Sequence, residues 1–187
     1  MDDGLRLVRP AAEHLDGYAD ALRRGWSPDT TRPEAAGEEL ARVAEDAARF
    51  LALQDDRDAA GGPVTLADGR VVPRLPGFRR WLWDGEFCGA VNLRWQAGTT
   101  ELPPTCSGHA GYTVVPWKRR RGYATRALAL LLPEARAVGL PWIDLVTRTD
   151  NVPSQRVILA NGGTLVGTGW GDDAEALHFR IPLDAIP

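Results

Sequence analysis

Residues 114–125 read Val114-Val115-Pro116-Trp117-Lys118-Arg119-Arg120-Arg121-Gly122-Tyr123-Ala124-Thr125, and they join an apolar strand to an amphipathic helix. Residues 111–115 have the apolar and β-branched content that is typical of a strand. The sequence predicts that a helix begins near Gly122, because apolar residues then recur at helical spacing, at Ala124, Ala127, Leu128, Leu131, Ala135 and Val138.

This junction has the features of a phosphate-binding turn. The first four N–H groups of a helix have no partner inside the helix, and the helix dipole places positive charge there. A diphosphate can therefore lie directly on the turn, and Gly122 lets the backbone approach it closely. The cations at 118–121 oppose the dipole, which favours an anion bound between them and the helix. The alternative is a solvated basic corner, the usual role of a charge run.

The spacing distinguishes this turn from two common phosphate loops. It lacks the Gly-Lys-Ser or Gly-Lys-Thr ending of a nucleotide P-loop and the three spaced glycines of a dinucleotide fold. It reads Arg-x-x-Gly-x-Ala, and so resembles the acyl-CoA pyrophosphate loop of the GCN5-related N-acetyltransferase (GNAT) family. A second motif of that family follows at the expected distance, at residues 151–163 (Asn-Val-Pro-Ser-Gln-Arg-Val-Ile-Leu-Ala-Asn-Gly-Gly).

Composition indicates an ordinary globular domain. A chain of 187 residues with 44% hydrophobic and 25% charged residues suits one domain that buries about 70% of its unfolded surface. The net charge of −3 argues against a general nucleic-acid binder. The N-terminus is acidic and no apolar stretch is long enough to span a bilayer, so we expect a cytoplasmic protein with no membrane partner. Cys88 and Cys106 lack metal-site spacing, so we expect two structural thiols and no metal.

Periodicity and turn residues predict the order of the elements. Apolar stretches between Gly, Pro and Asp turns predict strands, and longer stretches with apolar residues on one face predict helices. Pro133 is expected to kink the third helix or to end its first segment. The predicted strands are 5–9, 78–83, 87–95, 109–115, 142–147, 164–168 and 177–182, and the predicted helices are 13–26, Pro33 to Asp58, 122–138 and 153–160.

The order of these elements matches the GNAT architecture over nearly the whole chain. The resemblance implies an α+β (mixed α/β) acyl-CoA N-acyltransferase fold, with a central, mostly antiparallel sheet of about seven strands flanked by helices. We expect residues 1–187 to form a single GNAT domain. Residues 59–77 lie outside the pattern and are rich in Gly and Pro, so they are interpreted as a hairpin insertion.

The resemblance also implies the residues that bind acetyl-CoA, the expected co-substrate. Main-chain N–H groups at the turn would hold the pyrophosphate, and the side chains of the three arginines would add charge. The preceding strand would present its edge to the pantetheine amides, with one N–H on the thioester carbonyl; the alternative is an ordinary core strand. The expected cofactor contacts are Thr113, Val114, Val115, Arg119, Arg120, Arg121, Gly122, Tyr123, Ala124, Thr125, Asn151 and Ser154.

Two interpretations apply to Asn151. Asn151 and Ser154 have the spacing of a helix cap, with Pro153 at a favoured early helical position. In the family the matching asparagine also touches the pantetheine arm, so we expect both roles. Many members place a tyrosine seven residues later as the general acid for the departing thiolate, whereas this chain has Ile158. A thiol with a pKa of about 8.5 leaves without much help, so the reaction does not require that tyrosine.

The sequence gives weaker signals for the catalytic base and the acceptor site than for the cofactor site. His109 lies roughly where several family members keep a base that deprotonates the attacking amine, although a lone histidine is more often structural. Asp150 and water chains are the alternatives. Large aromatic residues usually fill cores, but the candidates for acceptor binding are Trp26 with Arg23 and Arg24, and Trp83, Asn92, Arg94 and Trp95.

These observations predict a function. We expect an acetyl-CoA-dependent N-acetyltransferase that transfers acetyl directly to an amine in a ternary complex. The acceptor would be a small-molecule or peptide amine, and the protein a monomer or homodimer. The main alternative is an acyl-CoA-binding sensor or regulatory module without turnover, which the absent tyrosine favours. Nucleic-acid binding through the arginine run is a third reading, and the overall charge argues against it.

Overall fold

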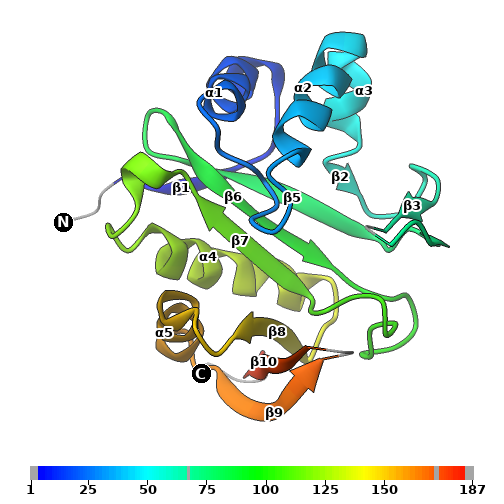
Figure 1. The fold of residues 1–187 in the computed structure, drawn as a ribbon, viewed down its shortest axis with the longest axis vertical. Coiled ribbons are helices and arrows are strands. Elements are labelled where there is room, and N and C mark those ends of the chain that lie inside the picture. Colours follow the sequence, from blue (N-terminus) through cyan, green and yellow to red (C-terminus); the bar gives the residue numbers. More distant parts are fainter. Residues whose placement is uncertain (1–3, 67, 171–172, 184–187) are drawn as a thin grey trace.

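A computed structural model describes residues 4–66, 68–170 and 173–183. Helices and two antiparallel sheets form layers (Figure 1). One face of the first sheet is covered by α1 (Ala12–Arg23), α2 (Ala35–Glu45) and α3 (Ala47–Ala52). The longer helix α4 (Tyr123–Ala137) covers the opposite face and packs against the second sheet, with α5 (Val152–Ala160) beside it. The mixed α+β class predicted from the sequence is therefore present.

The first sheet has the strand order β1-β5-β6-β7, with every pair antiparallel. Its strands are β1 (Arg6–Val8), β5 (Gly77–Trp83), β6 (Phe87–Arg94) and β7 (Ala110–Val114), and β2 (Asp55–Asp56) pairs with the start of β5. The predicted hairpin of β5 and β6 is present and turns at Asp84 and Gly85. Gly85 has a φ of 112°, which a residue with a side chain rarely adopts.

The second sheet contains β8 (Trp142–Arg148), β9 (Thr164–Trp170) and β10 (Asp173–Pro182), in the order β8-β10-β9. The predicted strands are thus divided between two sheets rather than joined in one. The sheets meet where the His109 N–H donates to the Asp144 C=O over 2.7 Å, just before β7 begins. From there β7 and β8 diverge (Figure 1), and in the described part of the chain they form no ladder.

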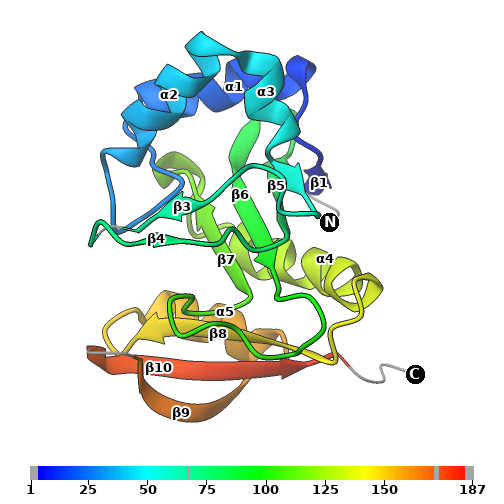
Figure 2. The ribbon, with the colours of Figure 1, turned by 90° about the vertical axis from the view of Figure 1, so that its right-hand side faces the viewer.

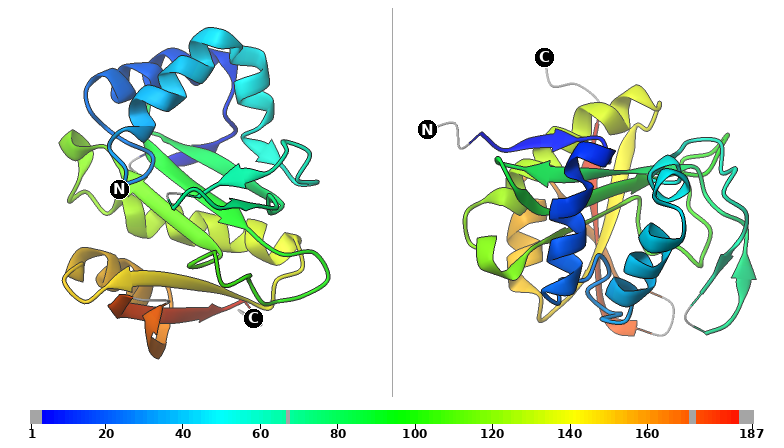
Figure 3. Two further views of the ribbon diagram at one scale, coloured as in Figure 1. Left: turned by 45° about the vertical axis from the view of Figure 1, so that its right-hand side comes forward. Right: turned by 90° about the horizontal axis from the view of Figure 1, so that it is seen from above.

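Successive side chains of the first sheet point to opposite faces, so the core is divided into two clusters. One cluster, with Leu82, Val91 and Leu93, lies between the first sheet, α4 and the second sheet. The other, with Tyr18 and Trp81, lies between the first sheet and α1 to α3, and these two rings stack with their centroids 4.4 Å apart. In the right-hand view of Figure 3, which is seen from above, the N-terminal helices lie across the first sheet. Each face of the first sheet therefore supports a separate layer of helix.

One prediction about the helices was wrong, and one of the two alternatives given for Pro133 was ruled out. The single helix expected from Pro33 to Asp58 is divided at Asp46, which is extended (φ −157°, ψ 92°) and accepts a hydrogen bond from the Arg49 N–H as the cap of α3. The competing helix start outweighs the continuous helical pattern. Pro133 does not end the third helix, because α4 continues through it to Ala137. The packing of α4 against both sheets offsets the loss of one main-chain bond.

Residues 59–77 contain the predicted hairpin, formed by β3 (Val64–Thr65) and β4 (Val71–Val72). Figure 2 shows it to one side of the first sheet, below α2 and α3. The glycine-rich turn predicted between the last two strands includes residues 171 and 172, which lie outside the described residues. β10 begins at Asp173, four residues earlier than predicted, because it pairs with β8 and β9 along its length.

Candidate active site

The first component of the site is the edge of β7 that faces β8. The Val115 N–H donates to the Cys88 C=O of β6 over 3.0 Å, so Val115 belongs to the sheet. Because main-chain groups alternate along a strand, the N–H and C=O of Val114 point away from β6, toward the side from which β8 diverges. The Val114 C=O accepts a hydrogen bond from Arg119 Nε at 3.2 Å. An extended ligand can pair with this edge as an added strand does.

The second component is the loop from β7 to α4. It contains a short 3-10 helix, η1 (Pro116–Lys118), and two residues with left-handed backbone, Arg120 (φ 61°) and Gly122 (φ 77°). The first main-chain bond of α4 runs from the Arg126 N–H to the Gly122 C=O. The N–H groups of residues 123–125 therefore lie ahead of the helix's own hydrogen bonds, and Gly122 leaves open space beside them. Main-chain N–H groups without a helical partner are able to bind an anion.

The four cations of the loop have different roles. Arg119, Arg120 and Arg121 are exposed, and Arg119 Nε donates to the Val114 C=O. Lys118 is 7% exposed, and its Nζ lies 2.7 Å from Oδ1 of Asp84, in the β5–β6 turn. Bonds to Asp84 and Glu86 outweigh burial and raise the pKa of Lys118. Lys118 is thus an anchor of the loop, which the charge run in the sequence did not distinguish from its neighbours.

Tyr123 is a second anchor of the loop. Its hydroxyl donates to Oδ2 of Asp84 over 2.6 Å, which ties this side chain to the β5–β6 turn. Burial would raise the pKa of Asp84, but the hydrogen bonds from Lys118 and Tyr123 hold it well below its ordinary value. Cys88 lies next to this cluster, with Sγ 3.5 Å from Lys118 Nζ, and burial raises the pKa of the thiol to about 12. Cys88 is therefore a buried thiol without nucleophilic character.

The N-terminus of α5 faces β7. Asn151 caps this helix as predicted, with Oδ1 accepting from the Ser154 N–H over 3.2 Å. From β7, the Tyr112 hydroxyl lies 2.7 Å from Ser154 Oγ and 3.2 Å from the main-chain oxygen of Ser154. Burial raises the pKa of Tyr112 to about 12. Ile158 is 1% exposed and packs in the core, so its side chain offers the site nothing polar.

Sequence reasoning did not find Tyr112. Its only signal is its position in the strand, two residues before Val114 and therefore on the same face of the sheet. Its partner Ser154 is 42 residues away in the sequence. Only the packing of α5 against the core brings these two hydroxyls together.

His109 is buried at the point where the two sheets meet. It is 1% exposed, and its Nδ1 accepts a hydrogen bond from the Asp144 N–H over 3.0 Å. Burial lowers the pKa of His109, and this outweighs the opposing effect of Asp144. The geometry is that of a neutral histidine that joins two strands. Asp150, the alternative base, lies at the surface with Oδ1 3.6 Å from Arg148 Nε.

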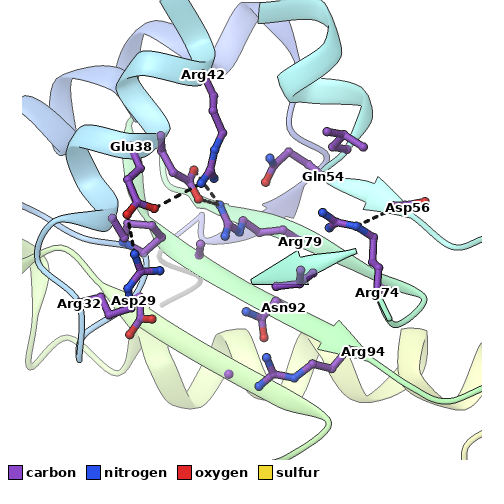
Figure 4. Close-up of a pocket in the computed structure, with 18 of the residues that line it drawn as sticks. Asp29, Arg32, Glu38, Arg42, Gln54, Asp56, Arg74, Arg79, Asn92 and Arg94 are labelled. Carbon is purple, nitrogen blue, oxygen red and sulfur yellow. Dashed lines mark hydrogen bonds and ion pairs between the residues drawn. The ribbon is translucent and has the colours of Figure 1, made fainter. Parts of the chain in front are cut away.

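A cavity of about 1640 Å³ lies on the opposite face of the first sheet, under α2 and α3 (Figure 4). β5, β6 and β7 form its floor, and the hairpin segment that holds β3 borders it. Asn92 and Arg94, two of the predicted acceptor residues, line this cavity, as do Gly111 and Thr113 of β7. The open edge of β7 and the cavity thus share one strand.

The predicted aromatic contacts lie elsewhere. Trp26 is 2% exposed in the core, and its Nε1 donates to Thr113 Oγ1 over 3.2 Å. Trp83 packs against the ring of His14, with centroids 4.5 Å apart. Trp95 borders a separate, smaller cavity of about 320 Å³. Arg24 stacks on Trp117 of η1 at 3.6 Å, whereas Arg23 is exposed at the end of α1. These positions suit the structural role that large aromatics usually have.

Most charges in the cavity are paired. Arg79 binds the carboxylate of Glu39 at 3.0 Å, and Glu39 also accepts a hydrogen bond from the Tyr18 hydroxyl. Arg32 lies 2.5 Å from Glu38, which also contacts Arg42. Within residues 4–66, 68–170 and 173–183 there is no group of three or more His, Cys, Asp or Glu that could hold a metal ion. None of the helices in those ranges is long and apolar enough to cross a membrane.

Solved structures with this fold are acetyltransferases of low sequence identity. The microcin C7 self-immunity acetyltransferase MccE, in complex with acetyl-CoA and AMP, has a TM-score of 0.61 at 11% identity, covering 96% of this chain and 93% of that chain. A putative GNAT-family acetyltransferase from Bordetella pertussis has a TM-score of 0.58 at 19% identity, covering 94% of each chain. RimL, a ribosomal L7/L12 α-N-protein acetyltransferase in complex with coenzyme A, has a TM-score of 0.60 at 14% identity, covering 97% and 95%. At these identities the likeness shows the fold.

The sequence itself gives the family. No curated protein matches it. The family model described as "Acetyltransferase (GNAT) domain" matches residues 5–164, which is most of the chain. This match confirms three predictions made from the motifs: the fold, the enzyme class and acetyl-CoA as the acyl donor. The chain belongs to the GNAT acetyltransferase family.

Proposed function

We propose that the protein transfers the acetyl group of acetyl-CoA directly to a primary amine, with both substrates bound at once. One observation supports this most strongly: β7 presents its edge to the space beside β8, and its face to the cavity under α2 and α3. A donor paired with the edge and an acceptor in the cavity would meet at the end of β7. The direct transfer involves no acyl-enzyme, and Cys88, the thiol beside the loop, is buried and has a raised pKa that disfavours the thiolate.

The residues of the loop fit the pyrophosphate of the donor. The N–H groups of residues 123–125 would bind its oxygens, and Arg119 to Arg121 would supply charge around them. The Val114 C=O, which can accept a second hydrogen bond beside that from Arg119, would pair with an amide of the pantetheine arm. Asn151 and Ser154 stand at the N-terminus of α5, on the other side of that arm. Thr113 would contribute through its main chain, since its side chain is bonded to Trp26.

The chemistry requires two groups from the protein. The acetyl thioester supplies a carbonyl carbon that a neutral amine attacks, forming a C–N bond as the C–S bond breaks. The Val114 N–H would stabilise negative charge on the carbonyl oxygen. The thiolate leaves with a pKa of about 8.5 and needs at most one proton. The Tyr112 hydroxyl, which is protonated and bonded to Ser154, takes the place of the tyrosine that Ile158 replaces.

Removal of the amine proton is assigned to water. His109 is neutral, but its Nδ1 is bonded to Asp144 and it does not line the cavity. Asp150 is exposed and lies outside the cavity as well. The cavity has room for ordered water between an amine near Thr113 and the carboxylates on α2. This route therefore suits the geometry better than either side chain named from the sequence.

The structural neighbours differ in their acceptors. The names of the structural neighbours include a ribosomal-protein N-terminus and spermidine, which are unrelated acceptors. A primary amine of a small molecule or peptide is the class that they share with our prediction. A cytoplasmic location and a monomeric or homodimeric state also stay predictions, as do the single-domain organisation and the reading of residues 59–77 as an insertion.

The test measures turnover and binding separately. Release of free CoA is followed with a thiol-reactive dye across a panel of small amines, amino acids and peptides, while calorimetry measures acetyl-CoA binding. We expect both tight binding and amine-dependent release. Tight binding without release on any amine would overturn the enzyme proposal and support the non-catalytic acyl-CoA sensor, which the absence of a tyrosine at position 158 favours.

A further inference from the structure

One arginine of the cavity differs from its neighbours. Arg32, Arg74 and Arg79 are each paired with a carboxylate of the cavity wall. Arg94 instead donates from Nε to the main-chain oxygen of Gly108 over 2.8 Å. In the part of the chain that the structure describes, no carboxylate forms an ion pair with Arg94, although its side chain is half-buried on the cavity floor.

The Gly108 contact orients the guanidinium. With Nε fixed to the main chain, the two terminal NH₂ groups remain as a fork that fits a carboxylate or a phosphate through two parallel hydrogen bonds. A partly buried charge without a counter-ion is costly to keep. The other half-buried arginines of the cavity, Arg32, Arg74 and Arg79, avoid this cost through carboxylates of the protein. Arg94 would avoid it when an anionic ligand binds.

The surroundings of Arg94 are open and polar. Asn92, two residues earlier on β6, points into the cavity beside it (Figure 4). Oδ1 of Asn92 is buried and has no hydrogen-bond partner among the described residues. Gly111 lies opposite, where an added Cβ would come within 3.2 Å of that oxygen. Glu38 and Glu39, two acidic residues of α2 that line the cavity, are already bound by Arg32 and Arg79.

The position of Arg94 sets the distance between the reacting amine of the ligand and its anionic group. The Arg94 N–H donates to the His109 C=O, while Ala90 pairs with Thr113, near the end of β7 where transfer would occur. Four residues of strand correspond to about 13 Å. An α-amino acid carries its amine and its carboxylate on one carbon. It is therefore too short to contact Arg94 while its amine lies near Thr113.

We propose that the cavity selects amine acceptors that carry a carboxylate or phosphate several bonds away from the reacting amine, and that Arg94 binds this anionic group. The proposal rests on the proposed function for the identity of the reacting end. It adds the chemical class of the acceptor and a specificity-determining residue. Asn92 would bind a polar group of the same ligand next to Arg94.

Four amines test the proposal: hexylamine, 6-aminohexanoate, 6-aminohexyl phosphate and glycine. Each is measured as an acceptor by CoA release and as a ligand of the CoA-bound protein by calorimetry. We expect the two long anionic amines to exceed hexylamine and glycine by about tenfold to a hundredfold in both measurements. The carboxylate and phosphate arms show which anion Arg94 prefers.

The variants distinguish a direct contact with Arg94 from the general positive charge of the cavity. Arg94→Gln is expected to remove the preference for the anionic amines and to leave hexylamine unchanged, while Arg94→Lys restores part of it. Arg49→Gln removes the same charge from an exposed arginine at the cavity wall and is expected to keep the preference. Equal binding of hexylamine and 6-aminohexanoate to wild type would overturn the inference. Binding with the expected preference but without CoA release would instead count against the proposed function alone.

Discussion

The ammonium of Lys118 lies 2.7 Å from Asp84 Oδ1, and both side chains are largely buried. The other oxygen of the same carboxylate accepts the hydroxyl proton of Tyr123. Lys118 precedes the Arg119–Gly122 loop and Tyr123 follows it, so Asp84 holds both ends of the loop to the β5–β6 turn. The loop is thereby fixed before any anion binds, which reduces the ordering cost of binding.

Replacing Asp84 tests this arrangement. Asp84→Asn removes the negative charge and leaves Lys118 buried without its main partner, so we expect a loss of about 3 to 5 kcal/mol in the free energy of unfolding. Acetyl-CoA binding should weaken as well, because the loop loses its anchor. Urea unfolding and calorimetry measure the two effects. Glu86→Gln is the matched control: Glu86 also contacts Lys118, at 3.2 Å, but its side chain is 80% exposed, so a change below about 1 kcal/mol is expected.

The same pair predicts a pH dependence. The pKa of Asp84 is lowered in the folded protein, so its stabilising contribution is complete above the unfolded value of about 4 and is lost as the pH falls toward the folded value. The difference in unfolding free energy between wild type and Asp84→Asn should therefore be constant from pH 7 to pH 5 and shrink below pH 4. A difference that does not change with acidification would show that Asp84 is not the titrating partner.

Gly122 tests the anion cradle. Its φ of 77° costs any other residue about 1 kcal/mol, whereas a Cβ would meet no atom within 4 Å. Gly122→Ala should therefore fold and bind acetyl-CoA with modest loss, while Gly122→Asp should abolish binding, because its carboxylate repels the pyrophosphate. Calorimetry with acetyl-CoA compares the variants. Gly139→Asp is the control, since Gly139 has a φ of 88° and open space but follows the other end of α4. Unchanged affinity in Gly122→Asp would exclude the cradle.

Tyr112→Phe tests the source of the thiolate proton. The change removes only the hydroxyl, so we expect kcat to fall by about tenfold to a hundredfold while acetyl-CoA binding changes little. The raised pKa of about 12 keeps this hydroxyl protonated at working pH, so wild-type kcat should show no decline from Tyr112 between pH 7 and pH 10. An unchanged kcat in Tyr112→Phe would mean that the thiolate leaves unassisted. Ser154→Ala, which keeps the phenol but removes its partner, should have a smaller effect.

His109 distinguishes a structural role from a catalytic one. Asn offers an oxygen that can accept the Asp144 N–H in place of Nδ1, whereas Ala cannot. A structural role predicts that His109→Ala loses about 1 to 3 kcal/mol of stability and that His109→Asn recovers much of it with normal kcat. A catalytic base would make both variants inactive. Thermal unfolding and steady-state rates are measured side by side.

The lowered pKa of His109 has a further consequence for stability. Below about pH 6.5 the unfolded chain binds a proton that the folded protein does not, so the free energy of unfolding should fall as the pH drops from 6.5. His109→Asn should remove this part of the pH dependence. A wild-type stability that stays constant between pH 6.5 and pH 5 would contradict the neutral, buried histidine.

Much of the main-chain structure around the candidate site was predictable because its signals are local. The cap at Asn151, the turn at Asp84 and Gly85, and the helix start at Gly122 each depend on residues a few positions apart, and the structure has all three. The division of the second predicted helix at Asp46 was missed, because a cap within a continuous helical pattern gives a weak signal. Trp26 was predicted as a contact from its residue type and its place at the end of the first helix, and His109 from the position of a base in several GNAT members, but both side chains are in the core.

The sequence by itself determined the order of the elements, the turn that precedes α4 and the family, because hydrophobic period, capping and glycine conformation act over short distances in the chain. Only the tertiary structure decided which cations are free. Lys118 is paired with a residue 34 positions away, Arg79 with one 40 positions away, and Arg94 with no carboxylate of the described chain. Pairing of this kind depends on how sheets and helices pack, and packing joins residues whose separation in the sequence carries no sign of their contact.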